Sequence, residues 1–186
     1  SPGRKVIGVA RFSDPDVRRR LEAAGIECLP RDLLEPDQVA DLPDAANVVY
    51  MAGRKFGTAG SEPFTWAMNV SVPTFVARRF RDCRIVAFST LCAVPFVDVR
   101  GRGADEQIPP TPFGEYANSC VGRERVFQFF GERNNCPGRL IRLNYAIDLR
   151  YGVLQDVALR VRAGQPIDLS TPIANIIWQG EAVAWI

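Results

Sequence analysis

The stretch RIVAFST, from Arg84 to Thr90, is an apolar run that ends in two hydroxyl residues. A short apolar run without alternation predicts a strand buried on both faces, as in a parallel sheet covered by helices. In open parallel α/β sheets, ligands bind at the carboxyl ends of the strands. The stretch therefore predicts a buried parallel strand with a candidate site at its Thr90 end.

Comparable runs recur on both sides of this stretch and alternate with helical patterns. Further strands are expected at Lys5–Ala10, Ile26–Pro30, Asn47–Gly53, Gly138–Asn144 and Asn175–Trp178. Helices are expected at Ser13–Gly25, Leu34–Pro43, Pro63–Arg81 and Gly152–Gly164, from Tyr116 onward and from Gly180 onward. The buried side of the Pro63–Arg81 helix is expected to carry Trp66, Val70, Phe75 and Phe80. This alternation predicts a doubly wound α/β fold with a mostly parallel sheet.

Composition limits the classes of function. The chain of 186 residues suits a single domain, and its net charge of +2 argues against a dedicated nucleic-acid surface. It has no histidine, which excludes Ser-His-Asp and Cys-His catalysis and removes the commonest metal ligand. The five cysteines include no CxxC pair, so neither a disulfide framework nor a metal site is expected. No apolar run approaches the ~20 residues that cross a bilayer, and we expect a cytoplasmic protein with reduced thiols.

Polar residues and glycine follow the expected strands at the ends where ligands would bind. A polar residue that ends a strand is more often a cap or turn former than a ligand. The joint occurrence of these positions with a tyrosine at the start of the next helix, Tyr116, favours a site. The strand-end positions are Arg11, Asp32, Gly53, Ser89, Thr90 and Asn144.

An ordered series of motifs covers nearly the whole chain. It consists of RDLLEP (31–36), NVVYMAG (47–53), MNVSVP (68–73), VAFST (86–90), YANSC (116–120) and RLNYAIDLRYG (142–152). In this order the motifs resemble the extended short-chain dehydrogenase/reductases, the NAD-dependent epimerase/dehydratase family. The resemblance implies a Rossmann-like fold and a nicotinamide cofactor.

The resemblance also implies roles for three candidate catalytic residues. Tyr116 matches the tyrosine that exchanges a proton with a substrate hydroxyl or carbonyl, and Thr90 matches the residue that orients the same oxygen. Cys120 stands four residues after Tyr116, where the family has a lysine that binds the nicotinamide ribose and lowers the pKa of the tyrosine. A cysteine cannot supply that charge. Arg123 or Lys55 is a candidate replacement for the lysine. Cys120 is better explained as a small, half-buried helix residue than as a redox or nucleophilic group.

The cofactor side follows from the same resemblance. Asp32 and Leu33 match the pair that contacts the adenine, and Asn69 matches a structural asparagine. Arg11 stands where the adenosine 2′ position would lie, which favours NADP over NAD. The segment under the ribose and pyrophosphate matches Met51, Ala52 and Gly53.

One departure concerns the beginning of the family's fold. The glycine-rich turn G-x-x-G-x-x-G that holds the pyrophosphate is absent, and Lys5–Ala10 matches the family's second strand. We expect residues 1–186 to form one Rossmann-like domain that lacks the first β-α unit and is incomplete at both ends. Without that unit, either a strand comes from elsewhere or the sheet pairs differently.

Three functions remain open on the sequence. The first is an NAD(P)-dependent epimerase/dehydratase-type oxidoreductase acting on a hydroxyl or carbonyl of a small polar substrate such as a nucleotide sugar. The second is a catalytically impaired relative that senses dinucleotides or binds proteins, and the third is an unrelated flavodoxin-like domain. The resemblance further implies a homodimer through the Tyr116 helix and the helix before Arg84; no nucleic acid or membrane partner is expected.

Overall fold

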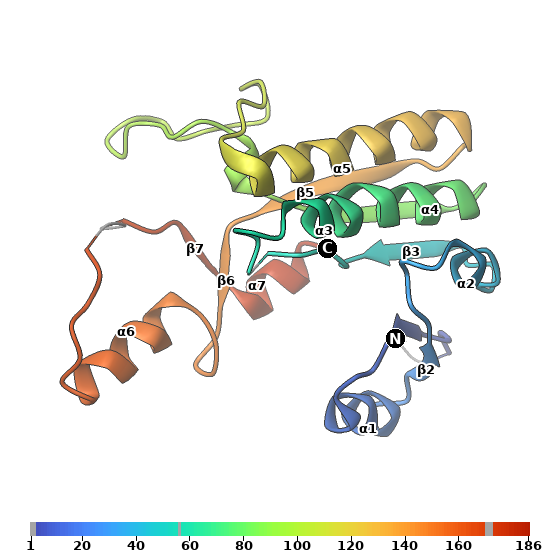
Figure 1. Cartoon of the computed structure of the whole chain (residues 1–186), viewed down its shortest axis with the longest axis horizontal. Coiled ribbons are helices and arrows are strands. Elements are labelled where there is room, and N and C mark those ends of the chain that lie inside the picture. Colours follow the sequence, from blue (N-terminus) through green and yellow to red (C-terminus); the bar gives the residue numbers. More distant parts are fainter. Residues whose placement is uncertain (1–2, 56, 170–172) are drawn as a thin grey trace.

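A computed structural model describes residues 3–55, 57–169 and 173–186. Their helices and strands alternate as predicted, except that the strands at 138–143 and 145–147 follow each other directly. Figure 1 shows α4 and α5 side by side over one face of the sheet that contains β4. The strands are β1 (Ile7–Ala10), β2 (Glu27–Pro30), β3 (Asn47–Tyr50), β4 (Arg84–Thr90), β5 (Gly138–Leu143), β6 (Tyr145–Ile147) and β7 (Ile176–Trp178). The helices are α1 (Pro15–Ala23), α2 (Pro36–Ala40), α3 (Glu62–Trp66), η1 (Ala67–Ser71), α4 (Val72–Arg79), η2 (Leu91–Ala93), α5 (Gly114–Arg133), α6 (Val153–Arg162) and α7 (Gln179–Ala184).

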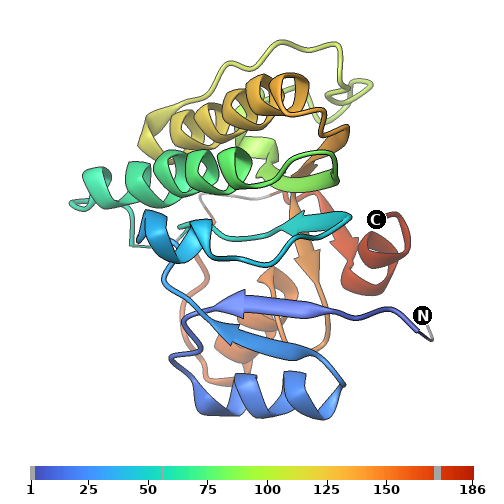
Figure 2. The ribbon, with the colours of Figure 1, turned by 90° about the vertical axis from the view of Figure 1, so that its right-hand side faces the viewer.

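Each pair of these strands runs parallel, which confirms the predicted type of sheet. Pairing divides the described strands into three groups: β1 with β2, β3 with β4 and β5, and β6 with β7. Figure 2 shows β1 between β2 and β3, yet no pairing joins β1 to β3 among the described residues. The β1–β2 sheet and the β3–β4–β5 sheet are therefore not hydrogen-bonded to each other among the described residues. The sequence predicts a missing strand at this position.

Local signals explain the first helix. The side chain of Asp14 accepts a hydrogen bond from the backbone of Asp16 at 2.9 Å, and Pro15 occupies the first turn. Gly25 follows the helix with a φ of +80°, a conformation that glycine adopts without strain. These two features set the start and the end of α1.

The predicted helix over Pro63–Arg81 is three successive segments. Its middle, η1, is a π-helical turn centred on Asn69, and π turns inside helices often mark functional sites. Trp66 is 38% exposed, so its predicted place in the core is wrong; its indole instead donates a hydrogen bond to Glu115. Phe80 is buried as predicted.

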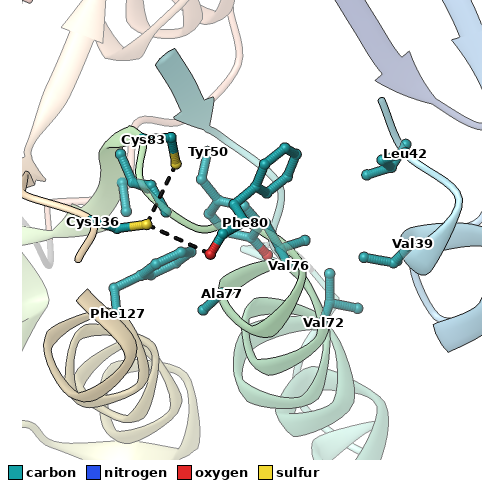
Figure 3. Close-up of a cluster of buried hydrophobic side chains, with 12 residues drawn as sticks. Val39, Leu42, Tyr50, Val72, Val76, Ala77, Phe80, Cys83, Phe127 and Cys136 are labelled. Atoms are coloured by element: carbon teal, nitrogen blue, oxygen red, sulfur yellow. Dashed lines mark hydrogen bonds between the residues drawn. The ribbon is translucent and has the colours of Figure 1, made fainter. Parts of the chain in front are cut away.

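The hydrophobic core lies between the helices and β3–β5. In Figure 3, Val72 and Val76 of α4 lie on the side of α2, while Phe127 of α5 lies on the side of Cys83 and Cys136. Tyr50 at the end of β3 packs against Phe127 with ring centres 4.9 Å apart. This core fixes the carboxyl ends of β3 and β4 relative to α5.

No described helix has the length and apolar composition needed to cross a bilayer. The described residues also contain no group of three or more carboxylate or cysteine side chains arranged to hold a metal ion.

Candidate active site

Thr90 ends β4 and is nearly buried. Its hydroxyl accepts a hydrogen bond from the backbone of Cys92 at 3.2 Å, which starts the short helix η2. The hydroxyl is thus held at the strand end by the turn that follows it.

Tyr116 lies in the first turn of α5, and its phenol meets the side chain of Thr90. Burial and, to a smaller extent, the neighbouring Cys120 raise the pKa of Tyr116 to about 12, while the contact with Thr90 acts in the opposite direction. The structure therefore brings together the two side chains that the sequence assigned to one substrate oxygen. With this pKa the phenol of Tyr116 is almost fully protonated at neutral pH.

Cys120 is fully buried one turn after Tyr116. Burial raises the pKa of its thiol, against the positive charge of Arg123 and a hydrogen bond from the phenol of Tyr116, which both lower it. The thiol is therefore neutral near pH 7 and fills the space beside the phenol without adding a charge.

The two residues considered as replacements for the lysine lie elsewhere. Arg123 turns inward and donates to the backbone oxygen of Phe88 at 3.0 Å and to the side-chain oxygen of Asn69 at 2.5 Å. Lys55 lies over the ring of Tyr145 with its nitrogen 5.4 Å from the ring centre. Neither Arg123 nor Lys55 therefore places its charge at the Cys120 position, where the family has its lysine.

A buried ion pair beneath the site escaped the sequence analysis. Glu124 is 0% exposed and accepts two hydrogen bonds from Arg142, at 2.9 and 2.7 Å. Ser89, which precedes Thr90, donates to the same carboxylate at 2.6 Å. Burial alone would raise the pKa of Glu124, but the hydrogen bonds from Arg142 and Ser89 outweigh burial and lower it.

The residues predicted for the adenosine side gather at the carboxyl ends of β1 and β2. Arg11 and Asp32 are within ion-pair distance at 4.0 Å, and both side chains are partly exposed. Asp32 also accepts a hydrogen bond from the backbone of Leu34 at 3.0 Å, while Leu33 packs against the core. An exposed carboxylate beside an exposed guanidinium can bind ribose or phosphate oxygens.

The segment after β3 divides into exposed and buried positions. Met51 is 71% exposed, whereas Ala52 packs against the core and Gly53 lies against the guanidinium of Arg123. Asn69 is fully buried and holds the backbone of Arg54 through two hydrogen bonds, of 2.8 and 3.0 Å. Three of the predicted cofactor residues lie on the inner side of the strand ends and not on the surface: Leu33 and Ala52 pack against the core, and Asn69 is buried.

These residues fit two parts of a nicotinamide dinucleotide. The Arg11–Asp32 end suits an adenosine, and the groups around Tyr116 suit the reacting end. The pyrophosphate in such folds is held by a G-x-x-G-x-x-G turn that opens a helix, and the sequence contains no such motif.

The fold and site define a class: a Rossmann-like α/β domain with a threonine–tyrosine pair at the carboxyl end of a parallel strand. Solved structures similar to this chain share its Rossmann-like fold. WbmG of Bordetella bronchiseptica, in complex with NAD and UDP, is 18% identical with a TM-score of 0.80, over 98% of this chain and 59% of that one. UDP-glucose 4-epimerase of Thermotoga maritima, with UDP-glucose, is 13% identical with a TM-score of 0.79, over 98% and 64%.

RMD of Pseudomonas aeruginosa, complexed with NADPH, is 17% identical with a TM-score of 0.69, over 97% of this chain and 72% of that one. At these identities the likeness establishes the Rossmann-like fold. No family model and no curated protein matches the chain. The chain spans about three fifths of the length of WbmG.

Proposed function

We propose that the chain carries the reacting half of an NAD(P)-dependent oxidoreductase of the epimerase/dehydratase type. The observation that carries the proposal is that the phenol of Tyr116 lies beside the side chain of Thr90 at the carboxyl end of β4, close enough for Thr90 to act on the pKa of the phenol. Two hydroxyl groups that converge at a strand end can both hydrogen-bond one substrate oxygen. Acid–base catalysis requires the catalytic group to be within hydrogen-bond reach of that oxygen.

The roles of the two residues follow from their chemistry. Thr90 donates a hydrogen bond to the substrate oxygen and keeps it beside the phenol. Tyr116 takes the proton of a substrate hydroxyl during oxidation and returns a proton to the carbonyl oxygen during reduction. The chemistry that a nicotinamide supplies when bound is hydride transfer to and from the same carbon.

Nucleotide sugars are the proposed substrates. The support is the set of similar structures, of which one is described with UDP and another with UDP-glucose. On the cofactor, one is described with NAD and one with NADPH. We propose that Arg11 and Asp32 hold the adenosine side and that Arg11 selects a 2′-phosphate, hence NADP.

A second candidate function is favoured by the electrostatics of the phenol. A tyrosine with a pKa of about 12 beside a neutral thiol is almost entirely protonated near pH 7, so very little phenolate is present to accept a proton. A relative that binds the dinucleotide without efficient turnover would keep the same fold and the same Arg11–Asp32 end.

One experiment separates the two candidates. NAD⁺ and NADPH are titrated against the protein, and UDP-glucose and UDP-glucuronic acid are then tested for conversion. Conversion that falls about 10²-fold or more in both Thr90→Val and Tyr116→Phe supports the oxidoreductase. Cofactor binding without conversion supports the sensor, and absence of both overturns the proposal.

A further inference from the structure

Arg123 is a buried cation that forms no ion pair among the residues described by the structure. It is 7% exposed, and its Nε atom lies buried without a hydrogen-bond partner. Its two terminal nitrogens donate to the backbone oxygen of Phe88 and the side-chain oxygen of Asn69. A buried charge without a counter-ion is costly, so its neutral contacts have to account for its place in the fold.

The space that Arg123 occupies exists because residue 53 is glycine. A Cβ at Gly53 would overlap the Nη2 atom of Arg123 and lie 3.0 Å from its Cζ atom. The φ of Gly53 is outside the left-handed region, so contact and not backbone strain excludes a side chain there. Guanidinium and glycine are therefore complementary in shape at the carboxyl end of β3.

From Asn69 the contacts continue in two directions. The side chain of Asn69 brackets the backbone of Arg54, next to Gly53, and its Nδ2 atom donates to the Oγ atom of Ser119 at 2.9 Å. Ser119 in turn donates to the backbone oxygen of Tyr116 at 2.8 Å. A continuous polar route thus joins Arg123 to the backbone of the candidate base.

The contact with β4 completes the arrangement. Phe88, whose oxygen binds Arg123, stands two residues before Thr90. We propose that Arg123 is a positioning residue, which clamps β3, η1 and β4 against α5 and so fixes the Thr90–Tyr116 pair against the surface that ends in Gly53. This inference rests on the proposed function, since positioning matters only if the pair acts on a substrate.

The charge of Arg123 adds an electrostatic consequence. It acts on the thiol of Cys120 and opposes the effect of burial on the pKa of that thiol. The other groups that act on Cys120 are Tyr116 and Glu124 from the same helix and Cys92 from η2. The charge of Arg123 thus acts on Cys120, and Cys120 is the neighbour of the Tyr116 phenol.

The test compares Arg123→Met, Arg123→Lys and Gly53→Ala with a matched control, Asn134→Ala. Asn134 is equally buried in the turn that ends α5 and donates to the backbone oxygens of Ala77 and Phe80, far along the helix from Tyr116. All four changes disturb buried polar contacts or packing, but only the first three alter the clamp.

Two readouts are taken: kcat and KM for UDP-glucose or UDP-glucuronic acid, and hydrogen exchange of the Arg54 amide, which Asn69 binds. Arg123→Met and Gly53→Ala are expected to lower kcat about 10²-fold with KM within a few-fold, since small misplacements cost that much. Arg123→Lys keeps the charge and is expected to fall in between. The Arg54 amide is expected to exchange about tenfold faster in the first two variants.

Asn134→Ala is expected to lose stability and to keep kcat per folded molecule. An equal fall of kcat in Asn134→Ala would overturn the inference, because it would mean that any buried polar loss has this effect. Unchanged exchange at Arg54 in Arg123→Met would overturn it as well. If the wild-type protein converts neither sugar, the proposed function fails while the exchange measurement still decides whether the clamp exists. If Arg123→Met does not fold, Gly53→Ala and Arg123→Lys carry both readouts.

Discussion

Glu124 and Arg142 form a two-bond ion pair whose carboxylate is wholly buried, 2.7 Å from the Nη2 atom of the guanidinium. The pair joins α5 to β5 directly beneath the strand end that carries Thr90. Because Ser89 donates to the same carboxylate, the ion pair also holds the last residues of strand β4.

Arg142→Met should destabilise the protein by about 3 kcal/mol, because it leaves the buried carboxylate of Glu124 without its cation. The free energy of unfolding in urea measures the loss. Replacing both residues by methionine should restore most of it. The control is Arg139→Met, an exposed arginine on the same strand, which should cost no more than about 0.5 kcal/mol. A double variant as unstable as Arg142→Met would contradict this account.

The same carboxylate predicts a dependence of stability on pH. The pKa of Glu124 is lower in the folded protein than its ordinary value of 4.5, so the folded state binds the proton less readily than the unfolded state. Its contribution is therefore complete above pH 4.5 and is lost as the pH falls through the lower folded value. The difference in unfolding free energy between the wild type and Glu124→Gln should shrink over that range. A difference that stays constant from about pH 6 to about pH 3 would contradict the prediction.

Cys120→Lys should increase the fraction of Tyr116 that is ionised to phenolate near neutral pH, because an ammonium group one turn away lowers the pKa of Tyr116 from about 12. If turnover requires the phenolate, kcat in the wild type rises with pH, and this rise should move to lower pH in the variant. Cys120→Ala is the matched control, since it removes the thiol without adding a charge. Equal pH profiles for the lysine and alanine variants would show that the charge has no part in the reaction.

The exposed ring of Phe129 is a candidate contact in a homodimer. Its ring is 56% exposed on α5, next to Phe130, which packs against the core, and the resemblance implies dimerisation through this helix and α4. If α4 and α5 form the interface, Phe129→Glu should turn a dimer into a monomer in analytical ultracentrifugation. A change at an exposed arginine of another helix, Arg160→Glu in α6, is the control. A wild-type protein that sediments as a monomer would remove the premise.

Local patterns predicted most of the helices and strands, and the failures lie where tertiary contacts decide. The strand expected over Gly138–Asn144 ends at Leu143, and the chain then enters β6 with a different partner strand. A hydrophobic run does not show which strand it pairs with, so the sequence does not predict the change of partner from β4 to β7. The sequence predicts ordinary helix at Ala67–Ser71, whereas the structure has a π turn there, because Asn69 gains its contacts from segments distant in sequence.

The site divides in the same way. The resemblance of the ordered motifs to a known family implies Thr90 and Tyr116 as site residues, and the structure brings them together. Glu124 was missed because a glutamate on a helix usually faces water, and only the fold brings Arg142 to it. Arg123 was noticed for its charge, but its contacts with Phe88 and Asn69 depend on the packing of three elements.

A double-mutant cycle on Thr90 and Tyr116 tests the central claim that the two side chains act on one substrate oxygen. The measurement is kcat for a nucleotide sugar in the wild type, Thr90→Val, Tyr116→Phe and the double variant. The account predicts that each single change costs about 10²-fold or more and that the double variant is hardly worse than the poorer single one. Losses that multiply independently, or a Tyr116→Phe variant that keeps the wild-type rate, would contradict it.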